Sequence, residues 1–238
     1  MLWYKAWMET RARFLISLVG ITALSSYSVY HGDREALPYT RIDYYYSVLQ
    51  GGHFLLATMW VVAVNLLMMG GLMREKAVGA SSFTLALPVS RARLMGVRIA
   101  TGFVEAMALV FVPWIAMFLI GSTFGKTHDF GQASFFIILL AGGGLLFFSI
   151  ALLMSSLVEG EYTAPVVSYG VVIAIAVAFS DRSLRAYNPW AFIVGSEYYD
   201  RRTALLVGPI PWMNVAVYVL LAAMLTVVSV KVIQRREF

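Results

Sequence analysis

Runs of apolar residues that are long enough to cross a bilayer recur along this sequence, and they restrict its fold more than any other feature. A transmembrane α-helix needs about 20 mainly apolar residues, and the helix that precedes a slightly shorter run can extend it. We therefore predict an all-α membrane protein in which residues 1–238 form a single transmembrane domain. Its six transmembrane helices are expected at about 14–29, 52–73, 99–120, 135–158, 163–179 and 214–230.

Composition supports this class and excludes several others. Apolar residues make up 60% of the 238 residues and charged residues only 13%, whereas soluble domains carry about 25% charged residues. The chain has no cysteine, so a disulfide framework and a thiolate metal site are excluded. None of the three histidines pairs with another at helix spacing, which argues against a metal site.

The basic residues predict which side of the membrane each segment faces. Segment 74–98, REKAVGASSFTLALPVSRARLMGVR, lies between the second and third apolar runs. With both termini inside, eleven Lys and Arg residues fall in the inner segments and seven in the outer ones. Inner loops carry the excess of bases, so we expect a multi-pass protein of the cell membrane (a bacterial inner membrane or a plasma membrane) with both termini cytoplasmic. The net charge of +5 reflects this orientation, and no nucleic-acid partner is expected.

Segment 74–98 also contains residues that typically begin and end helices. Ser81 or Ser82 can cap a short helix that runs through Leu87, and Pro88 ends it. Ser90 can cap a second helix that runs into the next span. A short cytoplasmic helix between two spans is a part that another protein could grip. The alternative is a basic loop that only sets the orientation of the chain.

This segment resembles the permease subunit of ABC-2 type exporters. The order and spacing that carry the resemblance are those of Glu75, Gly79, Phe83, Leu85, Leu87, Pro88 and Arg91. The chain departs from the family pattern at Ala80 and Ser82, where the family often has a Thr and an acidic residue. The resemblance implies that the segment forms a coupling helix that docks on a separate ABC ATPase, which would hold the ATP and Mg.

The resemblance also implies an assembly and two further features. Two permease subunits, identical or different, would form the translocation pathway, and each would offer its segment 74–98 to one ATPase. Short re-entrant helices are expected in the long outer segment 180–213, between spans 5 and 6. An N-terminal interfacial helix is expected at residues 1–13, where Trp3 and Trp7 recur at helical spacing. The alternative for this start is a cleavable signal peptide.

Two polar residues stand out inside the predicted spans. Asn65 and Glu105 each lie about 9 Å from the inner end of their span at 1.5 Å per residue. A carboxylate at that depth costs free energy and should face the bundle interior with a partner. We therefore predict an intramembrane polar pair, Asn65 and Glu105, that bond directly or share a water. Their contact is either a lock that loosens during transport or a static bond between helices.

The fourth span contains the successive glycines Gly142, Gly143 and Gly144. In a membrane, glycines permit close contact between helices, so we expect tight packing here. No Walker-type phosphate loop and no nucleophile elbow occurs in the sequence. We thus expect no catalytic residue, no cofactor bound by this chain and no enzyme activity of its own. A non-transporting membrane scaffold or assembly factor that binds a cytoplasmic partner is the alternative to the exporter subunit.

Overall fold

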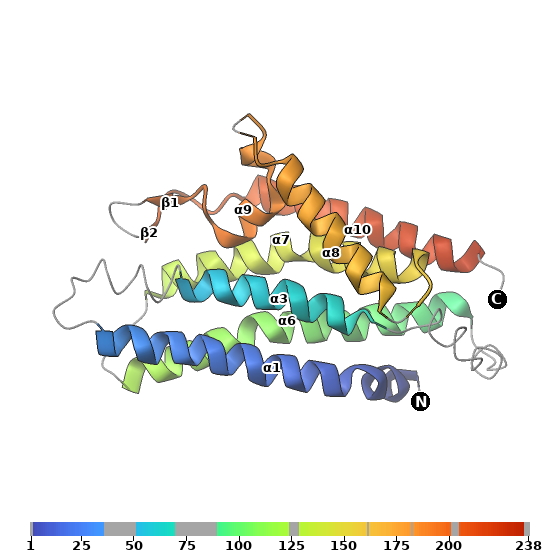
Figure 1. Ribbon diagram of the computed structural model, residues 1–238, viewed down its shortest axis with the longest axis horizontal. Coiled ribbons are helices and arrows are strands. Elements are labelled where there is room, and N and C mark those ends of the chain that lie inside the picture. The colour runs from blue at the N-terminus through green and yellow to red at the C-terminus, as the bar shows by residue number, and fades with distance from the viewer. Residues whose placement is uncertain are drawn as a thin grey trace.

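The computed structural model describes residues 2–35, 51–69, 90–123, 129–160, 162–181, 183–200 and 205–235. Within these ranges the chain is predominantly helical and its long helices form a bundle (Figure 1). The α-helices are α1 (Leu2–Glu35), α3 (Gly52–Leu67), α6 (Arg91–Thr123), α7 (Phe130–Leu157), α8 (Thr163–Ala178), α9 (Pro189–Val194) and α10 (Trp212–Arg235). A 3₁₀ turn, η2 (Arg185–Tyr187), precedes α9.

Four helices of the described residues are long and apolar enough to cross a membrane. They contain the candidate spans Leu2–His31, Ala92–Thr123, Phe130–Leu157 and Trp212–Arg235. Helices α3 and α8 are also apolar but have 16 residues each, about 24 Å at 1.5 Å per residue, which is short of the roughly 30 Å hydrocarbon core. The prediction of a mainly helical chain is confirmed, and four of the described helices are long and apolar enough for a multi-pass membrane protein.

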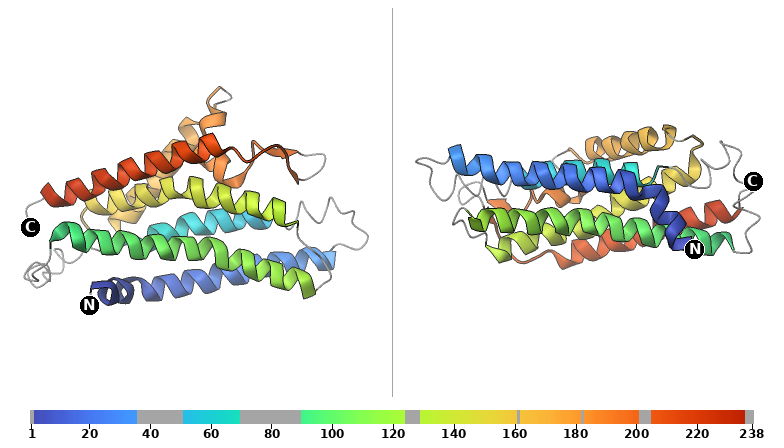
Figure 2. Two further views of the ribbon diagram at one scale, coloured as in Figure 1. Left: turned by 180° about the vertical axis from the view of Figure 1, so that it is seen from behind. Right: turned by 90° about the horizontal axis from the view of Figure 1, so that it is seen from below.

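The predicted N-terminal segment 1–13 and the predicted first span belong to one continuous helix, and an interfacial position of its first turns stays a prediction. Helix α1 has 34 residues and runs past the predicted end of the first span at residue 29. Its first turns bend away from the axis of the rest and cross over α6 (Figure 2). Because Thr10 of this stretch is buried and bonded to α6, tertiary contacts extend the helix beyond its apolar run.

Four helix ends meet at one end of the bundle. The start of α1, the end of α3, the start of α6 and the end of α10 lie together there, close to both chain termini, and α7 also turns into α8 at this end (Figures 1 and 2). The turn between α7 and α8 passes through Gly160, whose φ of 107° is a conformation that favours glycine. The segments predicted to be cytoplasmic therefore share one end, which we call the junction end.

Helix α7 is the centre of the bundle. In its most apolar 18 residues 72% are buried, against 22% in α10, and it packs on α3, α6, α8, α9 and α10. A Cβ added to Gly142 would lie 2.7 Å from Val215 of α10, one on Gly143 2.6 Å from Phe192 of α9, and one on Gly144 2.8 Å from Trp60 of α3. The predicted tight packing is confirmed, and each glycine meets a different helix.

The segment between α8 and α10 is short-helical with a small β element. Asn188 caps α9 by accepting hydrogen bonds from Trp190 N at 3.0 Å and Ala191 N at 3.3 Å, and Gly195 ends the helix with a φ of 75°. Most of α9 is buried, and it packs on α7; its re-entry into the membrane stays a prediction. Strands β1 (Tyr199–Asp200) and β2 (Leu205–Leu206) pair antiparallel, so the prediction of a purely α-helical chain misses one two-stranded turn.

Candidate functional site at the junction end

Most of the predicted coupling residues lie outside the described residues. These are Glu75, Gly79, Phe83, Leu85, Leu87 and Pro88, and the placement of Arg91 is described only for its backbone, as the first residue of α6. Ser90 marks the start of α6 as predicted: its Oγ accepts a hydrogen bond from Arg93 N at 3.2 Å, and its carbonyl oxygen accepts one from Leu94 N at 3.1 Å. The segment thus re-enters the bundle through a capped helix start.

The coupling segment begins just after the end of α3, where two arginines donate hydrogen bonds to backbone carbonyl oxygens. Arg13 Nη1 of α1 donates to Met69 O at 2.5 Å. Arg98 Nη2 of α6 donates to Met69 O at 3.3 Å and to Met68 O at 3.5 Å. Met68 is the C-cap of α3 and Met69 follows it. The carbonyl end of a helix carries partial negative charge and lacks partners within the helix, so guanidinium groups stabilise it. We call Arg13, Arg98 and the two carbonyls the arginine clamp.

Acidic and hydroxyl groups of α1 connect this clamp to α6. Arg98 Nη1 lies 3.5 Å from Glu9 Oε2, and Lys5 Nζ lies 3.8 Å from Glu9 Oε1. The next residue of α1, Thr10, donates a hydrogen bond from Oγ1 to Glu105 Oε1, two turns after Arg98 on α6. Exposed ion pairs contribute little free energy, but together with the clamp these contacts join α1, α3 and α6 where segment 70–89 leaves and re-enters the bundle.

Asn65 and Glu105 do not bond each other directly among the described residues. Asn65 Nδ2 donates to Val61 O of its own helix at 2.8 Å, and the hydrogen bond to Glu105 comes from Thr10. Both residues are buried, as predicted. Asn65 Oδ1 and Glu105 Oε2 each have no hydrogen-bond partner in the part of the chain that the structure describes. A shared water therefore stays a prediction.

The pairing of α3 with α6 explains why the direct bond is not made. Trp60 Nε1 of α3 donates to Ala106 O of α6 at 2.9 Å. Eight residues later in the chain, at Met68, the contact is with Arg98, which lies eight residues before Ala106. Helices α3 and α6 are thus antiparallel neighbours, as predicted, but their register sets Asn65 opposite Thr101. Glu105 is one turn away, about 6 Å along the axis. The equal depths expected from the sequence assumed that α6 begins near residue 99, whereas it begins at Arg91.

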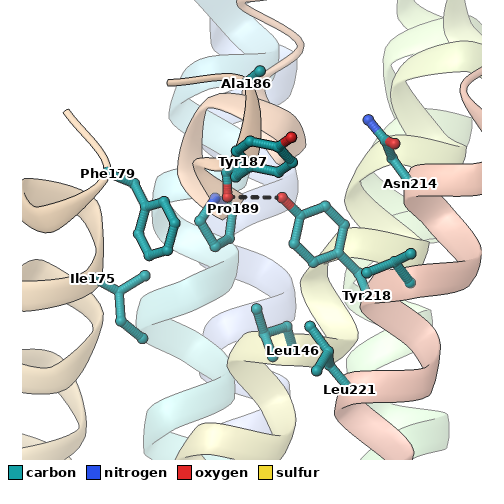
Figure 3. A pocket seen from close by; sticks show the side chains of 10 residues that line it. Leu146, Ile175, Phe179, Ala186, Tyr187, Pro189, Asn214, Tyr218 and Leu221 are labelled. Atoms are coloured by element: carbon teal, nitrogen blue, oxygen red, sulfur yellow. Dashed lines mark hydrogen bonds between the residues drawn. The ribbon is translucent and has the colours of Figure 1, made fainter. Parts of the chain in front are cut away.

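A second candidate site is a cavity of about 430 Å³ at the opposite end of the bundle, between α7, α8 and α10 (Figure 3). Its walls are mainly apolar and include Leu146, Ile175, Phe179 and Leu221. Tyr218 OH points across it and donates to Tyr187 O at 3.2 Å. Such a cavity suits an apolar molecule or an acyl chain, and no single polar group in it selects one ligand.

A polar pair borders this cavity. Asn214 Nδ2 donates to Tyr198 OH at 3.0 Å. Burial raises the pKa of the Tyr198 phenol above its ordinary value, and the hydrogen bond from Asn214 offsets part of that rise. The phenol is therefore neutral at physiological pH, and the rim of the cavity carries no charge from this residue.

Sequence reasoning missed the roles of Arg13, Arg98 and Thr10. In the sequence the two arginines indicate only orientation, and Thr10 carries no prediction. The available signal was that Glu105 in a span and Thr10 on an apolar face both require a polar partner. The cavity near α8 and α10 had no signal in the sequence, because its lining residues come from four separate segments.

No group of three or more potential metal-binding His, Cys, Asp or Glu residues occurs among the described residues. No protein-family model matches the chain, and no curated protein matches it.

Proposed function

We propose that this chain is the membrane-spanning permease subunit of an ATP-driven exporter similar to the ABC-2 type. In this proposal six helices cross the cell membrane, with α3 and α8 as the short spans, and both termini are cytoplasmic. Separate ATPase subunits hold the ATP and Mg and grip the coupling segment. The sequence pattern from Glu75 to Arg91 is the source of the proposal, and the geometry at the junction end supports it.

The arginine clamp is the observation that carries the proposal. A load applied to segment 70–89 reaches the end of α3 and the start of α6 through the backbone. Arg13 and Arg98 bind the carbonyls of Met68 and Met69 just after α3, so the same load reaches α1 as well. A coupling element needs such a rigid attachment, because a loop tethered loosely at both ends would absorb the movement of its partner.

In the proposed mechanism, ATP-driven closure of two ATPases brings two coupling segments together and tilts α3 and α6 in each subunit. Trp60 transmits this tilt within the bundle, since its indole is bonded to α6 and its ring packs on Gly144 of α7. A partner that bound both conformations equally would shift nothing. The free energy for the change must therefore come from a nucleotide-dependent difference in the ATPases.

A pathway formed by two subunits and a surrounding bilayer fits the exposed surface. Helices α8 and α10 expose large apolar side chains, among them Val166 at 68%, Met213 at 78% and Leu220 at 64%. In water, patches of this kind would associate. We propose that lipid covers part of this surface and a second permease subunit covers the rest.

Purification of the tagged chain in mild detergent, with its cytoplasmic partners, tests this function. We expect an ATPase to co-purify and to hydrolyse ATP. Phe83→Asp should remove the ATPase from the preparation, because it places a charge on the apolar side of the coupling helix, while Ser183→Asp at the opposite end of the bundle should not. A cytoplasmic partner without ATPase activity, lost in the same variant, would instead identify a scaffold.

A further inference from the structure

The cavity between α7, α8 and α10 lies in a gap between two helices that pack on a third. Helices α8 and α10 both pack on α7, and Leu146 of α7 lies at the back of the gap (Figure 3). Ile175 and Phe179 line the α8 side, and Val217 and Leu221 line the α10 side. Val217 is 47% exposed and Leu221 is 42% exposed, whereas Leu146 is only 7% exposed. The cavity therefore opens sideways, between α8 and α10.

The polarity of the lining changes along the cavity. At the end formed by the first turn of α10, Tyr218 OH donates to Tyr187 O at 3.2 Å, and the Asn214 amide lies at the same end (Figure 3). Leu221 follows Asn214 by seven residues, about 10 Å along α10 at 1.5 Å per residue, and the lining at that depth is aliphatic. A phospholipid in the adjacent leaflet has the same order, with polar ester groups near the surface and acyl chains towards the bilayer centre.

The surface beside the opening is apolar as well. Val177 of α8 is 65% exposed and Leu220 of α10 is 64% exposed, and α10 is a candidate membrane span. If both helices lie in a bilayer, lipid chains contact these side chains, and an acyl chain can enter the cavity without passing through water. None of the lining residues that the structure describes is acidic or basic. A charged group would lose its hydration there without gaining a counter-ion from them.

We propose that this cavity binds one acyl chain of a bilayer phospholipid from the leaflet at this end of the bundle. The chain enters between α8 and α10 and lies against Leu146, and its ester end lies near Asn214 and Tyr218. The cavity volume of about 430 Å³ is within the range of ligand sites. Because lipid chains are already apolar, the gain is in the van der Waals contacts that an empty cavity lacks. The proposal requires that α8 and α10 lie in a bilayer, but it does not depend on the exporter function.

A phosphatidylcholine that carries a photo-reactive diazirine in one acyl chain tests the proposal. The full-length protein is placed in nanodiscs with increasing fractions of this probe and irradiated, and mass spectrometry of its peptides identifies the labelled positions. Leu146 is the informative position, because lipid that only surrounds the helices contacts exposed residues such as Leu220 but not a residue at the back of the cavity. We expect labelling of Leu146 to saturate as the probe fraction rises, while labelling of Leu220 increases in proportion.

Val217→Trp should reduce the labelling of Leu146 at least about fivefold, because the indole competes with the acyl chain for the opening. Val219→Trp is the matched control and should keep the labelling, since Val219 lies on the same helix, is 38% exposed and does not line the cavity. Labelling of Leu146 that is absent or unsaturable in the unmodified protein, or equal in the two variants, would overturn the proposal. A diazirine fatty acid that labels Leu146 where the phospholipid does not would also overturn it and would identify a free amphiphile as the ligand.

Discussion

Single residues set how closely the helices of this bundle approach. Trp60 is fully buried, its indole nitrogen donates to Ala106 O of α6, and its ring lies on Gly144 of α7. A glycine at position 144 is therefore a requirement of packing rather than of backbone conformation. The bond to Ala106 prevents the indole from moving aside to admit a larger residue.

Gly144→Ala should destabilise the protein by about 1–3 kcal/mol, the usual cost of overpacking. Its new methyl group would lie 2.8 Å from two carbons of the Trp60 ring. Gly170→Ala is the matched control, because no atom lies within 4 Å of a Cβ at that position of α8. It should be neutral or stabilising through better helix propensity. Thermal unfolding in detergent, followed by circular dichroism, measures both, and equal effects would contradict the assigned packing.

The sequence predicts such positions well where one residue decides the outcome. The glycine run predicts close helix contact, and Ser90 predicts the start of a helix; both predictions are confirmed. The direct bond between Asn65 and Glu105 is not predictable in the same way. It depends on the register of two helices, and that register follows from contacts such as Trp60 with Ala106, which no local pattern encodes.

At the scale of elements, the junction end is where α1, α3 and α6 are joined. The arginine clamp binds the carbonyls of Met68 and Met69 just after α3. The sequence predicts the type and rough position of these helices from their apolar runs. It does not predict that the N-terminal turns join the first span in one helix, which the contact of Thr10 with Glu105 of α6 supports.

Arg98→Gln should loosen the end of α3, because a neutral side chain interacts less favourably with the carbonyl end of a helix. The effect of such a charge is about 0.3–1 kcal/mol, more when it is partly buried. Faster hydrogen exchange of the last-turn amides of α3 would show it. Under the proposed function, stimulation of ATP hydrolysis in the assembled complex should fall as well. Arg185→Gln, which removes a guanidinium bonded to Glu197, should change neither quantity.

Asn188→Ala should release α9 from its position. The change removes the two capping hydrogen bonds at the start of α9, a loss of about 0.5–2 kcal/mol. It also removes the bonds from Asn188 Nδ2 to Ala176 O and Phe179 O at the end of α8, both at 3.3 Å. Hydrogen exchange of the α9 amides should accelerate while that of α6 stays unchanged. Unaltered protection of α9 would show that its packing on Gly143 is sufficient.

At the scale of the whole molecule, the helix ends gather at two opposite ends of the bundle (Figure 1). The helix ends that flank segment 70–89 and the two chain termini lie at the junction end (Figure 1), and these inner segments carry eleven of the eighteen Lys and Arg residues. The rule that basic loops face the cytoplasm then predicts the orientation of every helix at once. The alternation of apolar and basic segments makes this level predictable from sequence, whereas the cavity between α7, α8 and α10 arises only when distant segments pack.

Cysteine labelling checks the orientation, since the chain has no cysteine of its own. Arg93→Cys and Ser183→Cys place exposed thiols at opposite ends of the bundle. A membrane-impermeant maleimide added to intact cells should label Cys at position 183 and should reach position 93 only after the membrane is permeabilised. The opposite pattern would place the coupling segment outside and contradict the orientation.

Cross-linking from the coupling segment tests the central claim most directly. A photo-reactive amino acid replaces Leu85, with a second variant at Ser183 as the control, and intact cells are irradiated. The account predicts that position 85 captures a cytoplasmic ATPase and that position 183 does not. Capture of proteins without ATPase activity alone, or of the same ATPase from both positions, would contradict it.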